Sequence, residues 1–178
     1  MEIGDKFIEF KLKGADGEMH SIYDYSDKGA LCIVFTCNSC DYSRAYGKRL
    51  IKLLNKYEDD SFGIIGINSN DAEKSPEDGF EQMKVISDKL GLEKINFMYL
   101  QDEDQSVAKA YGAKVNPEVF LFNSKRELVY KGAIDDNWQS AELVTRVYLE
   151  DAIEYCLDGL EVDFPEVPAI GCPITWKK

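Results

Sequence analysis

Residues 30–40 read Ala30-Leu31-Cys32-Ile33-Val34-Phe35-Thr36-Cys37-Asn38-Ser39-Cys40, an apolar run that ends in two cysteines. The run predicts a buried strand at 30–35, and the pattern after it predicts an amphipathic helix to about Tyr57. Backbone N–H groups at a helix start favour an anion. We therefore expect Cys37 to ionise readily and attack a substrate, and Cys40, one turn further along, to resolve the mixed disulfide.

A hairpin is expected before this stretch, and strands alternate with helices after it. An N-terminal hairpin is expected from 7–12 and 18–20. The elements expected downstream are a strand at 62–68, a helix from 75 to 91, a strand at 97–100, a short helix at 107–111, a hairpin of 118–123 and 127–131, and a helix at 140–157. This order predicts an α/β fold with a mixed central sheet flanked by helices. We expect a single domain over 1–178, in which 159–178 form a proline-containing C-terminal tail.

Composition narrows the class of protein. The chain has 178 residues and a formal net charge of −12, and a diffuse acidic surface repels phosphate backbones and anionic lipid. Nucleic acid and membrane are therefore not expected as partners. No apolar run is long enough to cross a bilayer and the first residues show no signal segment, so a cytoplasmic location is expected. Five cysteines is an odd number, which favours reduced or catalytic thiols over a structural framework.

The cysteine pair has competing interpretations. Half of a zinc site is one, but zinc usually takes four ligands, and the chain offers no second C-x-x-C and a single histidine, His20. No metal site and no cofactor are expected. Cys32 and Cys156 lie in apolar patterns and are expected in the core. Cys172 stands in a tail flanked by glycine and proline, so it is either a third redox thiol or part of a packed tail.

Asn116-Pro117 precedes the strand predicted at 118–122. A proline at this position can be cis, and it would then present the backbone of Asn116 to an extended substrate chain beside Cys37. The alternative is an ordinary trans proline at the start of a strand. Together with the cysteine pair, the position favours a cis bond and a substrate-binding role for Asn116 and Pro117.

Further motifs carry a resemblance to a known family. They are Gly66-Ile67-Asn68-Ser69-Asn70-Asp71, Tyr111-Gly112-Ala113, Asn116-Pro117-Glu118-Val119-Phe120-Leu121-Phe122, Tyr130-Lys131-Gly132 and Gly171-Cys172-Pro173-Ile174-Thr175-Trp176-Lys177. With the cysteine pair, the chain resembles the thioredoxin-like redoxins, within the superfamily of alkyl hydroperoxide reductase and thiol-specific antioxidant proteins. The resemblance implies a thioredoxin-like fold with an added N-terminal hairpin, a redox pair at Cys37 and Cys40 and a cis proline at Pro117.

The chain also departs from that family. Ser39 and Asp41 stand where relatives often carry histidine and proline. The strand at 31–36 has no acid, whereas thioredoxin has a buried acid there that assists proton transfer. That assistance is therefore missing or comes from elsewhere in this chain.

The leading interpretation is a thiol–disulfide oxidoreductase that cycles Cys37 and Cys40 between dithiol and disulfide. Its expected partners are a disulfide-containing protein or small molecule and a thiol electron donor, in cell redox homeostasis or antioxidant defence. Peroxide reduction ranks second. Peroxiredoxins carry a proline and a threonine upstream of their reactive cysteine, whereas here no proline lies near Cys37 and Thr36 is directly adjacent to it. A copper-handling module on this fold would pair the two cysteines with a downstream histidine, and this chain has no histidine after position 20. The last alternative is a non-catalytic interaction domain, in which Cys37 would be dispensable.

Overall fold

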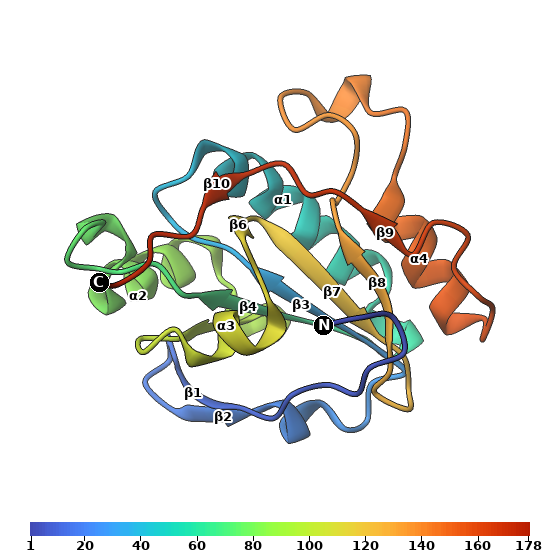
Figure 1. Cartoon of the computed structure of the whole chain (residues 1–178), viewed down its shortest axis with the longest axis horizontal. Helices are drawn as coiled ribbons and strands as arrows, with labels where there is room; N and C mark the ends of the chain where they lie inside the picture. The colour runs from blue at the N-terminus through green and yellow to red at the C-terminus, as the bar shows by residue number, and fades with distance from the viewer.

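An eight-stranded sheet organises the computed structural model, which describes all 178 residues (Figure 1). The strand order is β2-β1-β5-β4-β3-β7-β8-β9, and β10 pairs with β6 in a separate two-stranded sheet. The strands are β1 (Lys11–Gly14), β2 (Met19–Ser21), β3 (Ala30–Phe35), β4 (Phe62–Asn68), β5 (Met98–Gln101), β6 (Val115–Asn116), β7 (Glu118–Phe122), β8 (Leu128–Gly132), β9 (Glu166–Val167) and β10 (Cys172–Pro173). The helices are α1 (Asp41–Lys56), α2 (Phe80–Leu90), α3 (Ser106–Tyr111) and α4 (Tyr148–Leu157).

The central strand β3 confirms the predicted mixed sheet. It pairs parallel with β4 and antiparallel with β7, and every one of its residues is buried. Successive side chains of a strand point to opposite faces, so a strand buried on both faces is apolar throughout. The run 30–35 meets this requirement, which is why it predicts the centre of the fold.

Two apolar clusters cover the two faces of the sheet. Cys32 and Val34 belong to the cluster that includes residues of α1, α2 and α4, such as Leu50, Met83 and Leu149. The alternate residues of β3 belong to the other cluster, with residues of α3, the N-terminal segment and the tail. The sheet is therefore a middle layer between two hydrophobic cores.

The two predicted hairpins are confirmed with shifted boundaries. β1 pairs antiparallel with β2, and β1 also joins the main sheet through β5. β7 and β8 form the second hairpin.

The predicted helix at 140–157 is wrong over its first half. A short 3-10 turn occupies Ala141–Leu143, and α4 begins only at Tyr148. Asp136 accepts hydrogen bonds from the backbone and side chain of Thr145 and so holds this segment in a loop. The β-branched residues Val144, Thr145 and Val147 also have low helix propensity.

The C-terminal tail lies against the sheet and ends beside α2 (Figure 1). β9 pairs parallel with β8, and β10 pairs antiparallel with β6. Two glycines permit this close approach. A Cβ at Gly132, whose φ is +123°, would lie 1.6 Å from the Val167 oxygen, and a Cβ at Gly171 would lie 2.3 Å from the Asn116 oxygen. Both contacts are shorter than van der Waals contact, so only glycine fits.

A helix that spans a bilayer needs about 20 consecutive, mostly apolar residues. None of the helices combines the length and the apolar character needed to span a membrane.

Candidate active site

The cysteine loop differs from the predicted helix start. α1 begins at Asp41, and Cys40 is its N-cap residue with φ −96° and ψ 130°. Cys37 therefore lies in the loop before the helix, and the two cysteines are not one helical turn apart. Both are buried, with 5% of Cys37 and 3% of Cys40 exposed.

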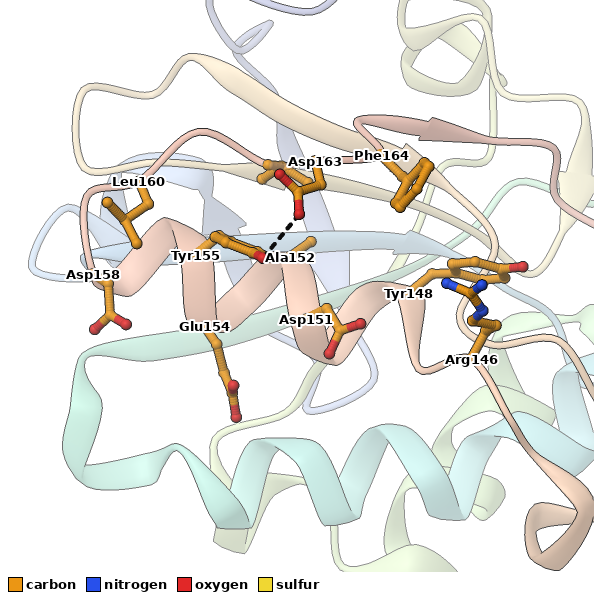
Figure 2. A pocket seen from close by; sticks show the side chains of 11 residues that line it. Arg146, Tyr148, Asp151, Ala152, Glu154, Tyr155, Asp158, Leu160, Asp163 and Phe164 are labelled. Carbon is orange, nitrogen blue, oxygen red and sulfur yellow. Dashed lines mark hydrogen bonds between the residues drawn. The ribbon is translucent and has the colours of Figure 1, made fainter.

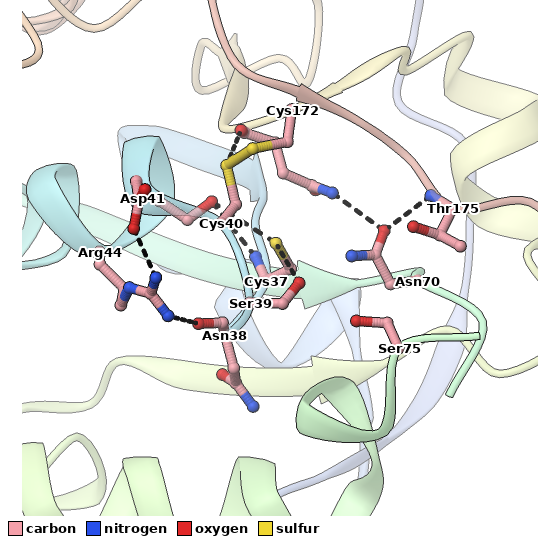
Figure 3. The surroundings of a disulfide bond; sticks show 12 residues. Cys37, Asn38, Ser39, Cys40, Asp41, Arg44, Asn70, Ser75, Cys172 and Thr175 are labelled. Carbon is pink, nitrogen blue, oxygen red and sulfur yellow. Dashed lines mark hydrogen bonds and ion pairs between the residues drawn. A yellow bond between two sulfur atoms is a disulfide. The ribbon is translucent and has the colours of Figure 1, made fainter. Parts of the chain in front are cut away.

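A disulfide joins Cys40 to Cys172 (Figure 3), across 132 positions of sequence and a Cα–Cα distance of 6.1 Å. Cys37 is a free thiol beside it. The pair Cys37–Cys40 expected from the sequence is therefore not the disulfide present in this structure. Cys172 reaches Cys40 because β10 pairs with β6 in a register that sets Cys172 opposite Asn116.

The bond between Asn116 and Pro117 is cis, as predicted. The Asn116 carbonyl oxygen lies 3.3 Å from Cys40 Sγ, and the residue is fully buried. Its side-chain Nδ2 donates to Asn70 Oδ1 at 3.1 Å, and its Oδ1 has no hydrogen-bond partner. The cis-proline loop thus contacts the disulfide directly and keeps one free acceptor.

A buried carboxylate, Asp78, holds the cysteine loop. Its Oδ1 accepts the backbone N–H groups of Asn38 at 2.6 Å and Ser39 at 3.3 Å, and its Oδ2 accepts the Ser39 hydroxyl at 2.6 Å. The Asn70 amide and the Ser75 hydroxyl donate to Oδ2 as well, each at 2.8 Å. These bonds keep the pKa of Asp78 below its ordinary value even though burial opposes ionisation.

The surroundings of Cys37 therefore oppose the ready ionisation that the sequence predicts. Burial raises its pKa above the ordinary thiol value, and the negative charge of Asp78 raises it further. Hydrogen bonds from Ser39, Ser43 and the Cys40 backbone act in the opposite direction. Asp78 also accepts the N–H groups of Asn38 and Ser39, so these donors do not serve the Cys37 sulfur.

Sequence reasoning missed Asp78, because Ser75-Pro76-Glu77-Asp78 reads only as a helix start. In the structure Pro76–Asp78 is a 3-10 turn before α2. The absence of an acid from the strand at 31–36 was the available signal that a carboxylate could come from another element.

The other two cysteines are in the core, as predicted. Cys32 is fully buried, and Cys156 is 9% exposed. Burial raises the pKa of both thiols, that of Cys156 to about 11. Neither contributes to the site around the disulfide.

Cys37 lines a cavity of about 420 Å³ between α1 and α2. A second cavity, of about 350 Å³, follows α4 and the start of the tail, where Tyr155 donates to Asp163 at 2.9 Å (Figure 2). This second cavity contains no cysteine, and its wall includes four carboxylates. No group of three or more His, Cys, Asp or Glu side chains could hold a metal ion.

A thioredoxin-like α/β fold with a cysteine at the start of α1 and a cis proline opposite defines a redox protein of the thioredoxin-like class. Residues 3–131 match the AhpC/TSA family, and the chain belongs to that family. A search of curated proteins finds no match.

Solved structures share the fold of this chain. A hypothetical protein from Sinorhizobium meliloti 1021 is 34% identical, with a TM-score of 0.91 over 99% of this chain and 96% of that one. An uncharacterized conserved protein from Geobacillus kaustophilus is 35% identical, with a TM-score of 0.91 over 99% and 93%. The thioredoxin domain of a thiol-disulfide oxidoreductase from Bacteroides vulgatus is 19% identical, with a TM-score of 0.59 over 74% and 88%, and shares the fold.

Proposed function

We propose that this chain is a thiol–disulfide oxidoreductase in which Cys37, Cys40 and Cys172 act as one relay. The observation that carries the proposal is a disulfide between Cys40 and Cys172 next to a free Cys37 thiol, in a thioredoxin-like redox fold. A disulfide exchanges only with a thiolate that can reach one of its sulfurs. Cys37 and Cys40 are three positions apart in one loop, so we expect Cys40 to exchange with both Cys37 and Cys172.

The relay begins with all three cysteines reduced. The Cys37 thiolate attacks one sulfur of a substrate disulfide, forms a mixed disulfide and releases the first substrate thiolate. Cys40 then attacks Cys37 Sγ and releases the second, which leaves a Cys37–Cys40 disulfide. Cys172 attacks Cys40 Sγ, frees Cys37 and forms the Cys40–Cys172 bond. A dithiol donor then reduces that bond, and its two electrons and two protons balance the conversion of one disulfide to two thiols.

Two features support the step in which Cys172 replaces Cys37 as the disulfide partner of Cys40. β10 remains beside Cys40 through its pairing with β6, so the third thiol is held close to its target. Reduction creates two S–H groups beside Asn116, whose buried Oδ1 has no partner. We expect the cytoplasm as the compartment, because thiol donors are maintained there and disulfides in it are usually transient.

The test is turnover of a disulfide by the whole chain with dithiothreitol as donor, followed in wild type, Cys37→Ser and Cys40→Ser. Wild type should turn over, and Cys37→Ser should fall to the uncatalysed rate. Cys40→Ser should trap the substrate on Cys37 as a mixed disulfide that intact-mass spectrometry detects. Undiminished turnover by Cys37→Ser would refute the relay.

Peroxide reduction is the competing function, because the family includes peroxide-reducing proteins by its name. In that case peroxide would oxidise Cys37 to a sulfenic acid, and Cys40 would resolve it with loss of water. Consumption of hydrogen peroxide with the same donor separates the two functions. Faster turnover of peroxide than of any disulfide would favour the competing one.

A further inference from the structure

The edge of the cis-proline loop, where an extended substrate chain would pair, is already occupied. Cys172 and Pro173 pair with Asn116 and Val115, and the Ile174 N–H donates to the Lys114 oxygen at 3.0 Å. A protein substrate would have to displace this segment before its backbone could pair there.

The tail is held at this edge by more than the disulfide. The Asp71 N–H donates to the Thr175 oxygen at 2.8 Å, and the Thr175 N–H donates to Asn70 Oδ1 at 3.0 Å. Ile174 is 3% exposed and belongs to one of the two cores. None of these contacts involves a cysteine sulfur, so we expect the edge to stay covered after reduction.

On its other side Cys37 borders the cavity between α1 and α2. Its volume of about 420 Å³ is within the range of small-molecule sites, which are typically a few hundred Å³ and mostly apolar. One stripe of α1 forms a wall, and Gly47 on that stripe leaves room, since a Cβ there would meet no atom within 4 Å. The apolar residues of the wall are Leu50, Ile51, Ile86, Leu90, Leu92, Phe97 and Tyr99.

The charge of this cavity is opposite to that of the whole chain. Three cations line it and no carboxylate does, although the net charge is −12. Arg44 is paired with Asp41, whereas Lys48 and Lys89 form no ion pair. An unpaired lysine at the rim of an apolar cavity attracts an anionic group on a bound molecule.

We propose that the substrate of Cys37 is a small disulfide with an apolar body and an anionic group, bound in the cavity between α1 and α2. The proposal rests on the proposed function and selects small molecules over protein chains. In the step concerned, Cys37 attacks one substrate sulfur, a Cys37–substrate disulfide forms, and the other half of the substrate leaves as a thiolate.

The experiment uses the oxidised whole chain, in which Cys37 is the free thiol outside the core. Two aromatic disulfides serve as probes: 5,5′-dithiobis(2-nitrobenzoate), which is a dianion, and 4,4′-dithiodipyridine, which is neutral. The released chromophore gives a single-turnover rate, from which the rate of Cys37→Ser is subtracted. Lys48→Glu removes a rim cation, and Lys52→Glu makes the same charge change one turn further along α1, outside the cavity.

Lys48→Glu should slow the dianion about fivefold or more and the neutral probe less than twofold, because close charges act more strongly than distant ones. Lys52→Glu should change both rates less than twofold. Gly47→Phe should fill the cavity and slow both probes at least tenfold, whereas Asn55→Phe on the exposed side of α1 should slow neither. Thermal unfolding should confirm that each variant is folded.

Equal effects of Lys48→Glu and Lys52→Glu, or unchanged rates in a folded Gly47→Phe, would overturn the proposal. Insulin and the dianionic probe are compared after the rate of each is divided by its rate with glutathione. If insulin then reacts as fast as the probe, the proposal is also overturned. These single-turnover rates need no donor and no exchange at Cys172. A failure of the relay would therefore appear as lost turnover with a normal cavity, and a failure of the cavity as normal turnover without probe selectivity.

Discussion

At the scale of single residues, Asp78 determines how the cysteine loop behaves. It accepts the loop N–H groups of Asn38 and Ser39 and adds a negative charge near Cys37. The loop is thereby ordered, and the pKa of its thiol is raised. Reactivity at Cys37 consequently depends on a carboxylate that is forty-one positions away in sequence.

Asp78→Asn should move the pH profile of Cys37 alkylation to lower pH. The charge of Asp78 raises the pKa of Cys37, so its removal lowers that pKa and increases the thiolate fraction at neutral pH. We expect iodoacetamide to label Cys37 roughly threefold faster at pH 7, and the free energy of unfolding to fall by about 2 kcal/mol through lost hydrogen bonds. Mass-resolved alkylation rates across pH measure the first effect and urea unfolding measures the second.

Glu77→Gln is the matched control, because it removes the same charge from the neighbouring, exposed position. Its alkylation profile should stay close to that of wild type. A profile of Asp78→Asn that coincides with wild type would show that the carboxylate does not act on Cys37.

At this scale the sequence indicates candidate residues better than it indicates which distant residues contact them. Local patterns predict the cis bond before Pro117, which the structure contains, and they single out Cys37 and Cys40 as candidates. The Cys40–Cys172 bond and the Asp78 contacts depend on how distant segments meet, and no local spacing encodes that. The charge of Asp78, which raises the pKa of Cys37, comes from such a distant segment.

At the scale of elements, α1 is joined to the loop after β8 by a partly buried ion pair. Arg49 donates to Asp135 at 2.7 Å and to two backbone oxygens of that loop, and the Tyr46 hydroxyl donates to Asp135 at 2.7 Å. The helical pattern does not single out Arg49, because the residue lies outside the apolar stripe.

Arg49→Met should lower the free energy of unfolding by about 3 kcal/mol, because it leaves the carboxylate of Asp135 buried without its cation. Lys52→Met, an exposed position of the same helix, should change it by less than about 0.5 kcal/mol. Urea unfolding of both variants is the measurement. Equal effects of the two substitutions would contradict this role of Arg49.

The attachment of β10 to β6 depends on Gly171. Gly171→Ala would bring a Cβ to 2.3 Å from the Asn116 oxygen, so the strand must move away. We expect the oxidised protein to lose more than about 1 kcal/mol of stability. The exposed neighbour provides the control, since Ile170→Ala should have little effect. Unchanged thermal unfolding of Gly171→Ala would mean that the two strands do not approach this closely.

At the scale of the whole molecule, the disulfide closes a loop that includes most of the chain. The order of strands and helices and the mixed sheet follow from hydrophobic periodicity, and the sequence therefore predicts this level well. Short strands such as β9 and β10 were missed, because two-residue strands form through tertiary contacts and leave no periodic signal.

Reduction of the Cys40–Cys172 bond should lower the free energy of unfolding by about 2–4 kcal/mol, because the bond constrains the unfolded chain. We propose that residues 1–178 nevertheless unfold as one cooperative unit in both states. The amides of Ile174 and Thr175 should stay protected from hydrogen exchange after reduction. Loss of that protection would show that the tail depends on the disulfide.

The most direct test of the relay is the disulfide formed by Cys172→Ser. One equivalent of a small disulfide is added to the reduced variant, free thiols are alkylated, and peptides are mapped by mass spectrometry. The relay predicts a Cys37–Cys40 bond in the variant, whereas wild type treated in the same way should contain Cys40–Cys172 and alkylated Cys37. A variant with alkylated Cys40 and no bond between Cys37 and Cys40 would contradict the relay.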